Sequence, residues 1–169
     1  MITVEDVKKL REMTGVGMLD CKNALTEAEG NLDKAVEILR EKGFAKAAKK
    51  ATRIAAEGAV GAVVEGNTGV LVEVNCESDF VSKGEKFQEI VNNIARVIAK
   101  NKPSNIEELN ACSFGDGTVA DYITERTMVI GEKLSIRRFE VFETEGKIET
   151  YIHMGGKVGV MVEACPFDS

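Results

Sequence analysis

The chain has 169 residues and a mass of 18.3 kDa, enough for one ordinary domain or for a small domain and a medium one. Hydrophobic residues make up 44% of it and charged residues 30%, with no Trp, which is typical of a globular protein and excludes a disordered or fibrous one. The formal net charge of −6 disfavours a general nucleic-acid binder, because neutralising phosphates requires a basic surface.

Residues 1–43 predict a bundle of three short helices, which is small enough to be marginal alone and is therefore plausible as a docking domain. Thr3 and Asp6 form the pattern of a capping box, and the first helix ends at Thr14-Gly15. A second helix begins near Leu19 and ends at Gly30. Asn31 caps a third helix, which we expect to end at Gly43. The expected inward faces are Val4, Val7, Leu10 and Met13; Ala24, Leu25 and Ala28; and Leu32, Ala35, Val36 and Leu39.

The amino-terminal stretch "MITVEDVKKLREMTG" places charged residues where a signal peptide needs an apolar run. No later segment approaches the length of a membrane-spanning helix. We therefore expect a chain that stays in the compartment where it is made and does not contact a membrane.

A basic connector follows, and we assign residues 44–56 to it as a helical linker. The stretch "KGFAKAAKKATR", residues 42–53, carries lysines and an arginine but no acid. Charge runs of this kind are usually solvated faces. A nucleic-acid site would also need interleaved aromatic residues, and Phe44 is the only one here.

Residues 57–140 predict a first α+β subdomain. Val60, Ala62 and Val64 alternate before a turn at residues 66–69, and Val70, Val72 and Val74 alternate after it, which indicates a hairpin with one buried face. A long helix over residues 83–100 has an apolar stripe suited to cover that face. A capping box at Thr118–Asp121 begins another helix, and "SIRRFEVF" reads as a strand. The stripe contains Phe87, Ile90, Val91, Ile94, Val97 and Ile98.

Residues 145–163, "EGKIETYIHMGGKVGVMVE", repeat the pattern of residues 57–73, "EGAVGAVVEGNTGVLVE". Residues 141–169 therefore predict the start of a second subdomain, which lacks the long helix that follows the first hairpin. An uncovered hairpin face is an aggregation hazard. We expect the chain either to form a homodimer or to expose apolar surface around Val158, Val160 and Val162.

Catalytic groups are sparse. The cysteines, Cys21, Cys76, Cys112 and Cys165, form no C-x-x-C pair and are expected to be reduced and mostly buried. A Cys76/His153 nucleophile pair is the remaining enzymatic hypothesis, that of a cysteine-dependent hydrolase, although it has no local signature. Residues 155–157, Gly-Gly-Lys, are more simply a hairpin turn than a phosphate loop. We predict no metal, no cofactor and no chemical catalysis.

Three stretches together carry a resemblance: "LREMTGVGMLDCKNAL", "AKAAKKATRIAAEG" and "VNCESDFVSKGEKF", with "IRRF" and "YIHMGGKVGV" following in order. The chain resembles the elongation factor Ts family, the guanine-nucleotide exchange factors of the GTPase elongation factor Tu. The resemblance implies a three-helix, ubiquitin-associated-like domain followed by two related α+β subdomains. It also implies a cytoplasmic translation factor that binds elongation factor Tu and makes no direct contact with nucleic acid.

The resemblance further implies site residues. In this family a Thr/Ser-Asp-Phe turn enters the GTPase beside the nucleotide, and its Phe disturbs the elements that hold Mg²⁺ and phosphate. The matching positions here are Ser78, Asp79, Phe80 and Val81, with Ser where the family often has Thr. Arg11, Met18 and Leu19 match positions that dock on the GTPase domain.

Alternatives remain open for these residues. Phe80 could fold beneath the next helix near Phe87, with Asp79 as a helix N-cap, and residue physics alone favours that interpretation. Met18 beside Leu19 could be core, although adjacent helix residues cannot both point inward. The alternative function is a protein-interaction module that docks a partner without exchange activity.

Overall fold

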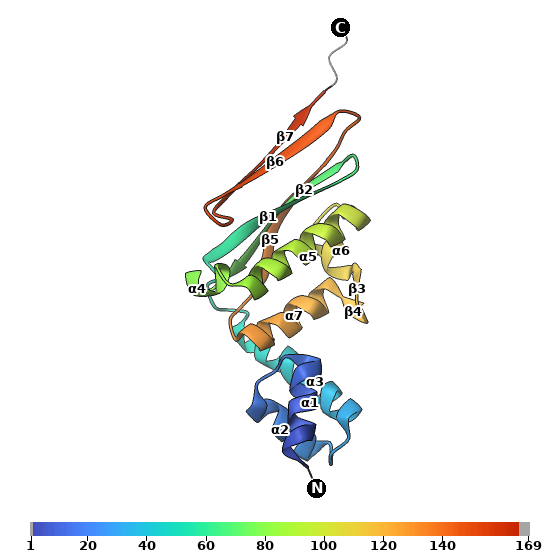
Figure 1. The fold of residues 1–169 in the computed structure, drawn as a ribbon, viewed down its shortest axis with the longest axis vertical. Helices are drawn as coiled ribbons and strands as arrows, with labels where there is room; N and C mark the ends of the chain where they lie inside the picture. The colour runs from blue at the N-terminus through green and yellow to red at the C-terminus, as the bar shows by residue number, and fades with distance from the viewer. Residues whose placement is uncertain (1, 166–169) are drawn as a thin grey trace. The chain divides into compact units, whose positions relative to one another are not determined.

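A computed structural model describes residues 2–165 of the chain (Figure 1). Helices come first, and antiparallel strands with further helices follow, so the predicted α+β class is confirmed. The chain divides into two compact units. One contains the residues up to Thr52 together with Thr124–Gly131, and the other contains Arg53–Ile123 together with the residues from Glu132 onward.

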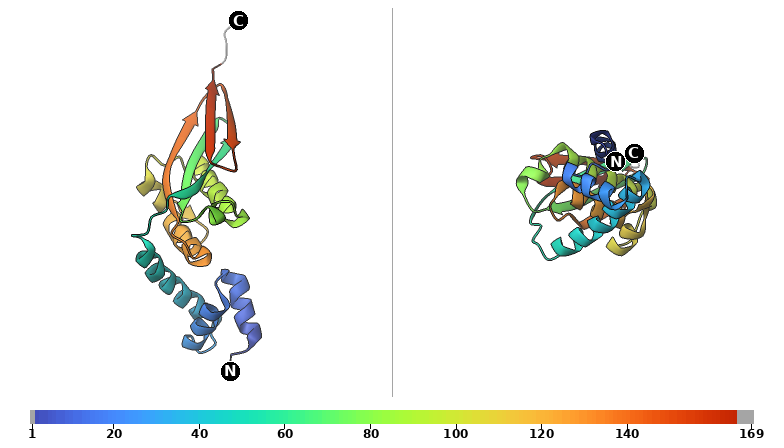
Figure 2. Two further views of the ribbon diagram at one scale, coloured as in Figure 1. Left: turned by 90° about the vertical axis from the view of Figure 1, so that its left-hand side faces the viewer. Right: turned by 90° about the horizontal axis from the view of Figure 1, so that it is seen from below.

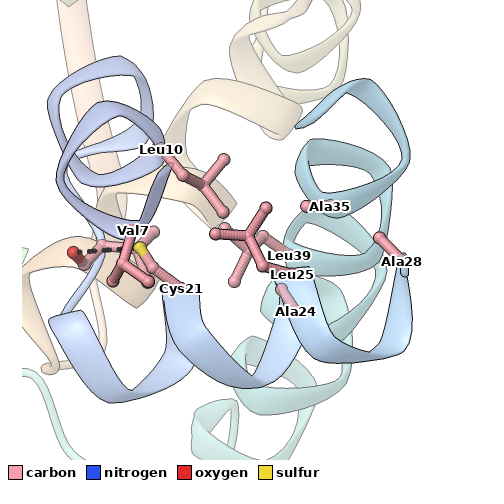
Figure 3. Packing of buried hydrophobic residues seen from close by; sticks show 9 residues of the cluster. Val7, Leu10, Cys21, Ala24, Leu25, Ala28, Ala35 and Leu39 are labelled. Carbon is pink, nitrogen blue, oxygen red and sulfur yellow. Dashed lines mark hydrogen bonds between the residues drawn. The ribbon is translucent and has the colours of Figure 1, made fainter. Parts of the chain in front are cut away.

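The first unit contains α1 (Val4–Thr14), α2 (Met18–Glu27) and α3 (Leu32–Lys50). The predicted capping box is present, because Thr3 Oγ1 accepts from the Asp6 N–H at 3.1 Å while the Asp6 carboxylate accepts from the Thr3 N–H at 2.9 Å. Val4 and Met13 are exposed, so their assignment to the inward face is wrong. The buried core, which Figure 3 shows, consists of Val7, Leu10, Val16, Cys21, Ala24, Leu25, Ala28, Ala35 and Leu39.

The expectation that the third helix ends at Gly43 is wrong, since α3 continues to Lys50. Gly43 is buried in the helix, and a Cβ added there would lie 2.8 Å from Met128 Sδ. Met128 belongs to the last turns of α7 (Val119–Ile130), which pack against this core. The glycine therefore marks a close approach of two helices and not a helix end. The proposed boundaries at residues 43 and 56 remain predictions.

Two lysines of the basic stretch 42–53 form ion pairs with acids of α2. Lys46 Nζ lies 3.0 Å from Asp20 Oδ2, and Lys42 pairs with Glu27. These groups are solvent-exposed, so each pair contributes little to stability. The pairing supports the interpretation of residues 42–50 as a solvated helical face.

The second unit is built on a three-stranded antiparallel sheet of order β1-β2-β5, from β1 (Glu57–Glu65), β2 (Thr68–Cys76) and β5 (Ser135–Glu143). Helix α5 (Glu85–Asn101) packs on one face, and all six residues of its predicted stripe are buried. The predicted hairpin, long helix and following strand are confirmed. The second predicted capping box also forms, with Thr118 N–H donating to Asp121 Oδ2 at 2.9 Å.

The face assigned to β1 is wrong. The register places Ala59 opposite Val74 and Gly61 opposite Val72, and residues directly opposite each other share a face. The small residues Ala59 and Gly61 are buried, and Gly61 lies against Val91 of α5, whereas Val60 points to the other side. The alternation indicated the wrong face because Val60, Ala62 and Val64 lie on the side of the sheet away from α5, a side that is also packed against another part of the chain.

That second side is covered by another hairpin, β6 (Lys147–His153) with β7 (Val158–Ala164). The Val60 N–H donates to Gly156 O at 2.8 Å, and a Cβ on Gly159 would lie 2.5 Å from Val60 Cγ1. Figure 2 (left) shows this hairpin alongside the three-stranded sheet. The outer side of β7 exposes Val158, Val160 and Val162, so the chain exposes the apolar surface expected there. Dimerisation through it stays a prediction.

Four short elements have no strong periodicity and were not predicted. The first lies directly between β2 and α5 and carries the candidate site. The short elements are α4 (Asp79–Ser82), α6 (Ile106–Ala111), β3 (Ser113–Phe114) and β4 (Gly117–Thr118).

Among residues 2–165, no helix is both long and apolar enough to cross a membrane.

Candidate functional site

The turn between β2 and α5 is a single helical turn with its own cap. Strand β2 ends at Cys76, and Ser78 has extended backbone angles and caps α4 by accepting the Val81 N–H at 3.3 Å on its Oγ. The earlier alternative of Asp79 as the cap is wrong, since Asp79 is the first helical residue. Four predicted site residues, Ser78, Asp79, Phe80 and Val81, are thus brought together in one short segment.

Phe80 projects from this turn into solvent with 85% of its surface exposed. The alternative in which it packs beneath the next helix near Phe87 is wrong, because Phe87 is buried and Phe80 is not. Ser82, two residues later, is buried and anchors the turn, with its Oγ donating to Asp79 O at 3.0 Å. A large exposed aromatic on an anchored turn is a candidate contact with another molecule.

The turn is held from a distant part of the sequence. Glu132 Oε2 accepts the backbone N–H groups of Glu77 at 3.0 Å and Ser78 at 2.9 Å, and Glu132 Oε1 accepts the Ser78 hydroxyl at 2.6 Å. The Lys133 N–H donates in return to Glu77 Oε1 at 2.6 Å. Sequence reasoning missed Glu132, because no local pattern links it to a turn more than fifty residues earlier.

Asp79, next to Phe80 in the chain, lies near two lysines. The Lys83 ammonium, 2.7 Å from Asp79 Oδ2, holds the pKa of Asp79 below its usual value, and Lys157 contributes further through its charge. Lys157 lies in the turn between β6 and β7 and pairs with Glu57 Oε2 at 2.6 Å. Asp79 is therefore a carboxylate at neutral pH, and the turn presents both an anion and an apolar ring.

The structure opposes the Cys76/His153 hydrolase hypothesis. Cys76 is fully buried, and this burial, together with the Glu132 charge, raises the pKa of its thiol to about 11. A nucleophilic cysteine needs the opposite, an accessible thiolate at neutral pH. Instead the Cys76 thiol donates to Ser78 O at 3.2 Å, which adds another contact beneath the turn. His153 is exposed, and its Nδ1 lies 2.8 Å from the Tyr151 hydroxyl oxygen.

No cysteine among residues 2–165 forms a disulfide; two are buried, Cys112 is intermediate and Cys165 is exposed. Within the same residues, no group of three or more His, Cys, Asp or Glu side chains could hold a metal ion.

The first unit presents a second exposed surface, formed by Arg11, Met18 and Leu19. Gly15 ends α1 in the left-handed region with φ of 69°, and its N–H donates to Arg11 O at 2.7 Å. The chain turns so that α2 begins at Met18. Val16 packs inward, whereas Leu19 is 72% exposed and Met18 39% exposed. Neither Met18 nor Leu19 is buried in the core. Because adjacent helix residues cannot both point inward, at least one of them had to be exposed.

The turn lies within a segment that matches a known protein family. A family model described as "Elongation factor TS" matches residues 77–166, a segment that begins at Glu77 and covers more than half of the chain. The chain belongs to the elongation factor Ts family. The resemblance inferred from the sequence stretches is thereby confirmed.

Close relatives carry the same name. The chain is 51% identical over 174 residues to elongation factor Ts of Clostridium perfringens (strain SM101 / Type A), an alignment that covers 100% of this chain and 57% of the relative. It is 51% identical over 165 residues to elongation factor Ts of Syntrophotalea carbinolica, which covers 96% of this chain and 54% of the relative. The chain thus spans a little over half the length of these elongation factor Ts relatives.

Proposed function

We propose that this chain is a translation elongation factor that acts in the cytoplasm and promotes GDP release from elongation factor Tu. The observation that carries the proposal is the 85% exposed Phe80 on an anchored turn, in a chain of the elongation factor Ts family. Ser78, Asp79, Phe80 and Val81 would form the contact that dislocates the Mg²⁺ site of the GTPase. The factor makes or breaks no covalent bond and needs no cofactor.

The physical mechanism is a wedge. Mg²⁺ in a GTPase bridges phosphate oxygens and offsets their charge, so displacing the elements that support it weakens GDP binding. An aromatic ring is suited to this task because it is large and rigid and loses little conformational entropy on insertion.

Thermodynamic linkage then releases the factor. If the factor weakens GDP binding, GDP weakens the factor's binding by the same ratio, by about 1–3 kcal/mol in typical allosteric pairs. A rebinding nucleotide therefore displaces the factor, and the cycle needs no energy source beyond nucleotide binding itself.

The direct test measures release of fluorescently labelled GDP from purified elongation factor Tu, with and without the chain. We expect acceleration that saturates with chain concentration. Binding without acceleration would leave the alternative function, a docking module without exchange activity. That alternative has its own supporting observation, the exposed corner of the first unit, which can dock a partner without Phe80.

A variant of this corner tests the docking role of Arg11, Met18 and Leu19. Leu19→Ser should weaken association with elongation factor Tu by roughly tenfold or more, because an exposed leucine in an interface centre loses its apolar contact. The maximal rate of GDP release at saturating chain concentration should stay nearly unchanged, since the proposed contact at residues 78–81 is intact. The free energy of unfolding should change by less than about 0.5 kcal/mol.

Val4→Ser is the matched control, because Val4 is an exposed apolar residue of the same unit outside the proposed docking set. If the wild type and Leu19→Ser bind elongation factor Tu with equal affinity in a titration, Leu19 is not part of the interface. Loss of affinity in both variants would indicate a general effect of surface polarity.

A further inference from the structure

The segment that carries Phe80 is held by a reciprocal arrangement of two acidic residues, which we call the acidic clasp and define as Glu77 and Glu132. Glu132 accepts three hydrogen bonds, two from the backbone N–H groups of residues 77 and 78 and one from the Ser78 hydroxyl. Glu77 in turn accepts the Lys133 N–H. The clasp joins the end of β2 to the chain just after α7, and all of its members lie in the second unit.

Glu132 supports the N-cap of α4 through the Ser78 hydroxyl. The Ser78 Oγ donates to Glu132 Oε1 at 2.6 Å and accepts the Val81 N–H at 3.3 Å, so one hydroxyl joins the carboxylate to the first turn of the helix. Hydrogen bonds to a carboxylate are shorter and stronger than neutral ones. Glu132 therefore fixes the rotamer that allows Ser78 to cap the helix.

Such support is needed because a helix of four residues does not form on its own. The first hydrogen-bonded turn of a helix is unfavourable in isolation, and α4 ends before propagation can compensate. Its geometry must come from contacts with the rest of the unit. The clasp supplies contacts at the N-terminal end, and Ser82 O, which accepts from Gln88 Nε2 at 2.8 Å, supplies one at the other end.

We propose that Glu132 is a positioning residue for nucleotide exchange, acting through Ser78 on the orientation of Phe80. Because these hydrogen bonds hold the turn in the shape in which Phe80 projects, inserting the ring into the partner requires little further ordering of the turn. Preorganisation of this kind lowers the entropic cost of an induced contact. The inference rests on the proposed exchange function, and Glu132 itself need not touch the partner.

The first test is Glu132→Gln, which keeps the side-chain shape but removes the charge and replaces one acceptor oxygen with an amide donor. Weakening hydrogen bonds to a charged group should lower the maximal rate of GDP release from elongation factor Tu by about tenfold. The chain concentration that gives half-maximal release should change less than about twofold, because the proposed docking corner carries affinity separately. Glu140→Gln, at an exposed position on β5, is the matched control and should match the wild type.

A double-mutant cycle separates positioning from a general structural effect. If Glu132 acts through the ring, Glu132→Gln should have almost no further effect on the release rate when Phe80→Ala is already present. A similar loss in both backgrounds would overturn the proposal. Should Glu132→Gln fold poorly, Ser78→Ala breaks the same contact from the turn side and should show the same dependence on Phe80.

Amide hydrogen exchange of the free chain measures the clasp without the partner. The amides of residues 77 and 78 should exchange faster in Glu132→Gln, while those of the α5 core stay protected. Faster amide exchange with an unchanged GDP release rate would overturn the positioning role and leave the exchange function intact. A wild-type chain that does not accelerate release at all would overturn the exchange function, and the positioning role with it.

Discussion

Phe80→Ala is expected to remove most of the acceleration of GDP release from elongation factor Tu while the chain still folds and binds. Phe80 is 85% exposed, so truncating it leaves no cavity and should change the free energy of unfolding by less than about 0.5 kcal/mol. An aromatic hot spot contributes ~2 kcal/mol or more, which corresponds to a loss of about 30-fold in the maximal release rate. The measurement is stopped-flow release of labelled GDP at saturating chain.

Phe44→Ala is the matched control, because Phe44 is another exposed phenylalanine, on α3 and outside both proposed contact surfaces. It should accelerate release as the wild type does. A titration of nucleotide-free elongation factor Tu should show that Phe80→Ala still binds, since the docking corner is unchanged. If Phe80→Ala kept the full release rate, the wedge would be excluded and a different part of the chain would have to displace GDP.

The sequence alone predicted the helices whose signals are local. The capping boxes at Thr3 and Thr118 place side chains and backbone donors three residues apart, so nothing beyond the segment is needed to recognise them. The stripe of α5 was equally clear, since six apolar residues at helical spacing predict a helix with one buried face, and all six are buried. Element type was therefore predictable wherever one segment contained its own pattern.

Features that depend on a second segment were not predictable. Gly43 reads as a helix end, and only the packing of Met128 against it shows why a glycine lies within a helix. Phe80 reads as core, because apolar residues usually are. Its exposure depends on Ser82 being the residue that turns inward and on Glu132 reaching the turn from elsewhere. The family resemblance pointed to residues 78–81 as a candidate contact, but it gave no indication of the clasp that supports them.

The face of β1 is the most instructive error, and it leads to a prediction about stability. The alternation of Val60, Ala62 and Val64 predicted that these residues lie beneath the helix, but the residue that lies against α5 is Gly61, on the opposite face of β1. A Cβ added at Gly61 would lie 2.4 Å from Val91 Cγ1, inside any allowed contact. Val91 is fully buried, and a β-branched side chain in a helix has one strongly preferred rotamer. The strand carries a glycine there because α5 lies too close for anything larger.

Gly61→Ala should therefore destabilise the second unit by about 1–3 kcal/mol, as overpacking does, despite the gain from a less flexible unfolded chain. Chemical denaturation followed by circular dichroism measures the change. Val91→Ala alone should also be destabilising, because it leaves a cavity. In the double variant, the Cβ added at residue 61 occupies part of the space that Val91 Cγ1 leaves, so the double variant should be more stable than the sum of the single effects predicts. Strict additivity, or a stabilising Gly61→Ala, would mean that α5 can move away from β1 freely and that close packing does not explain the glycine.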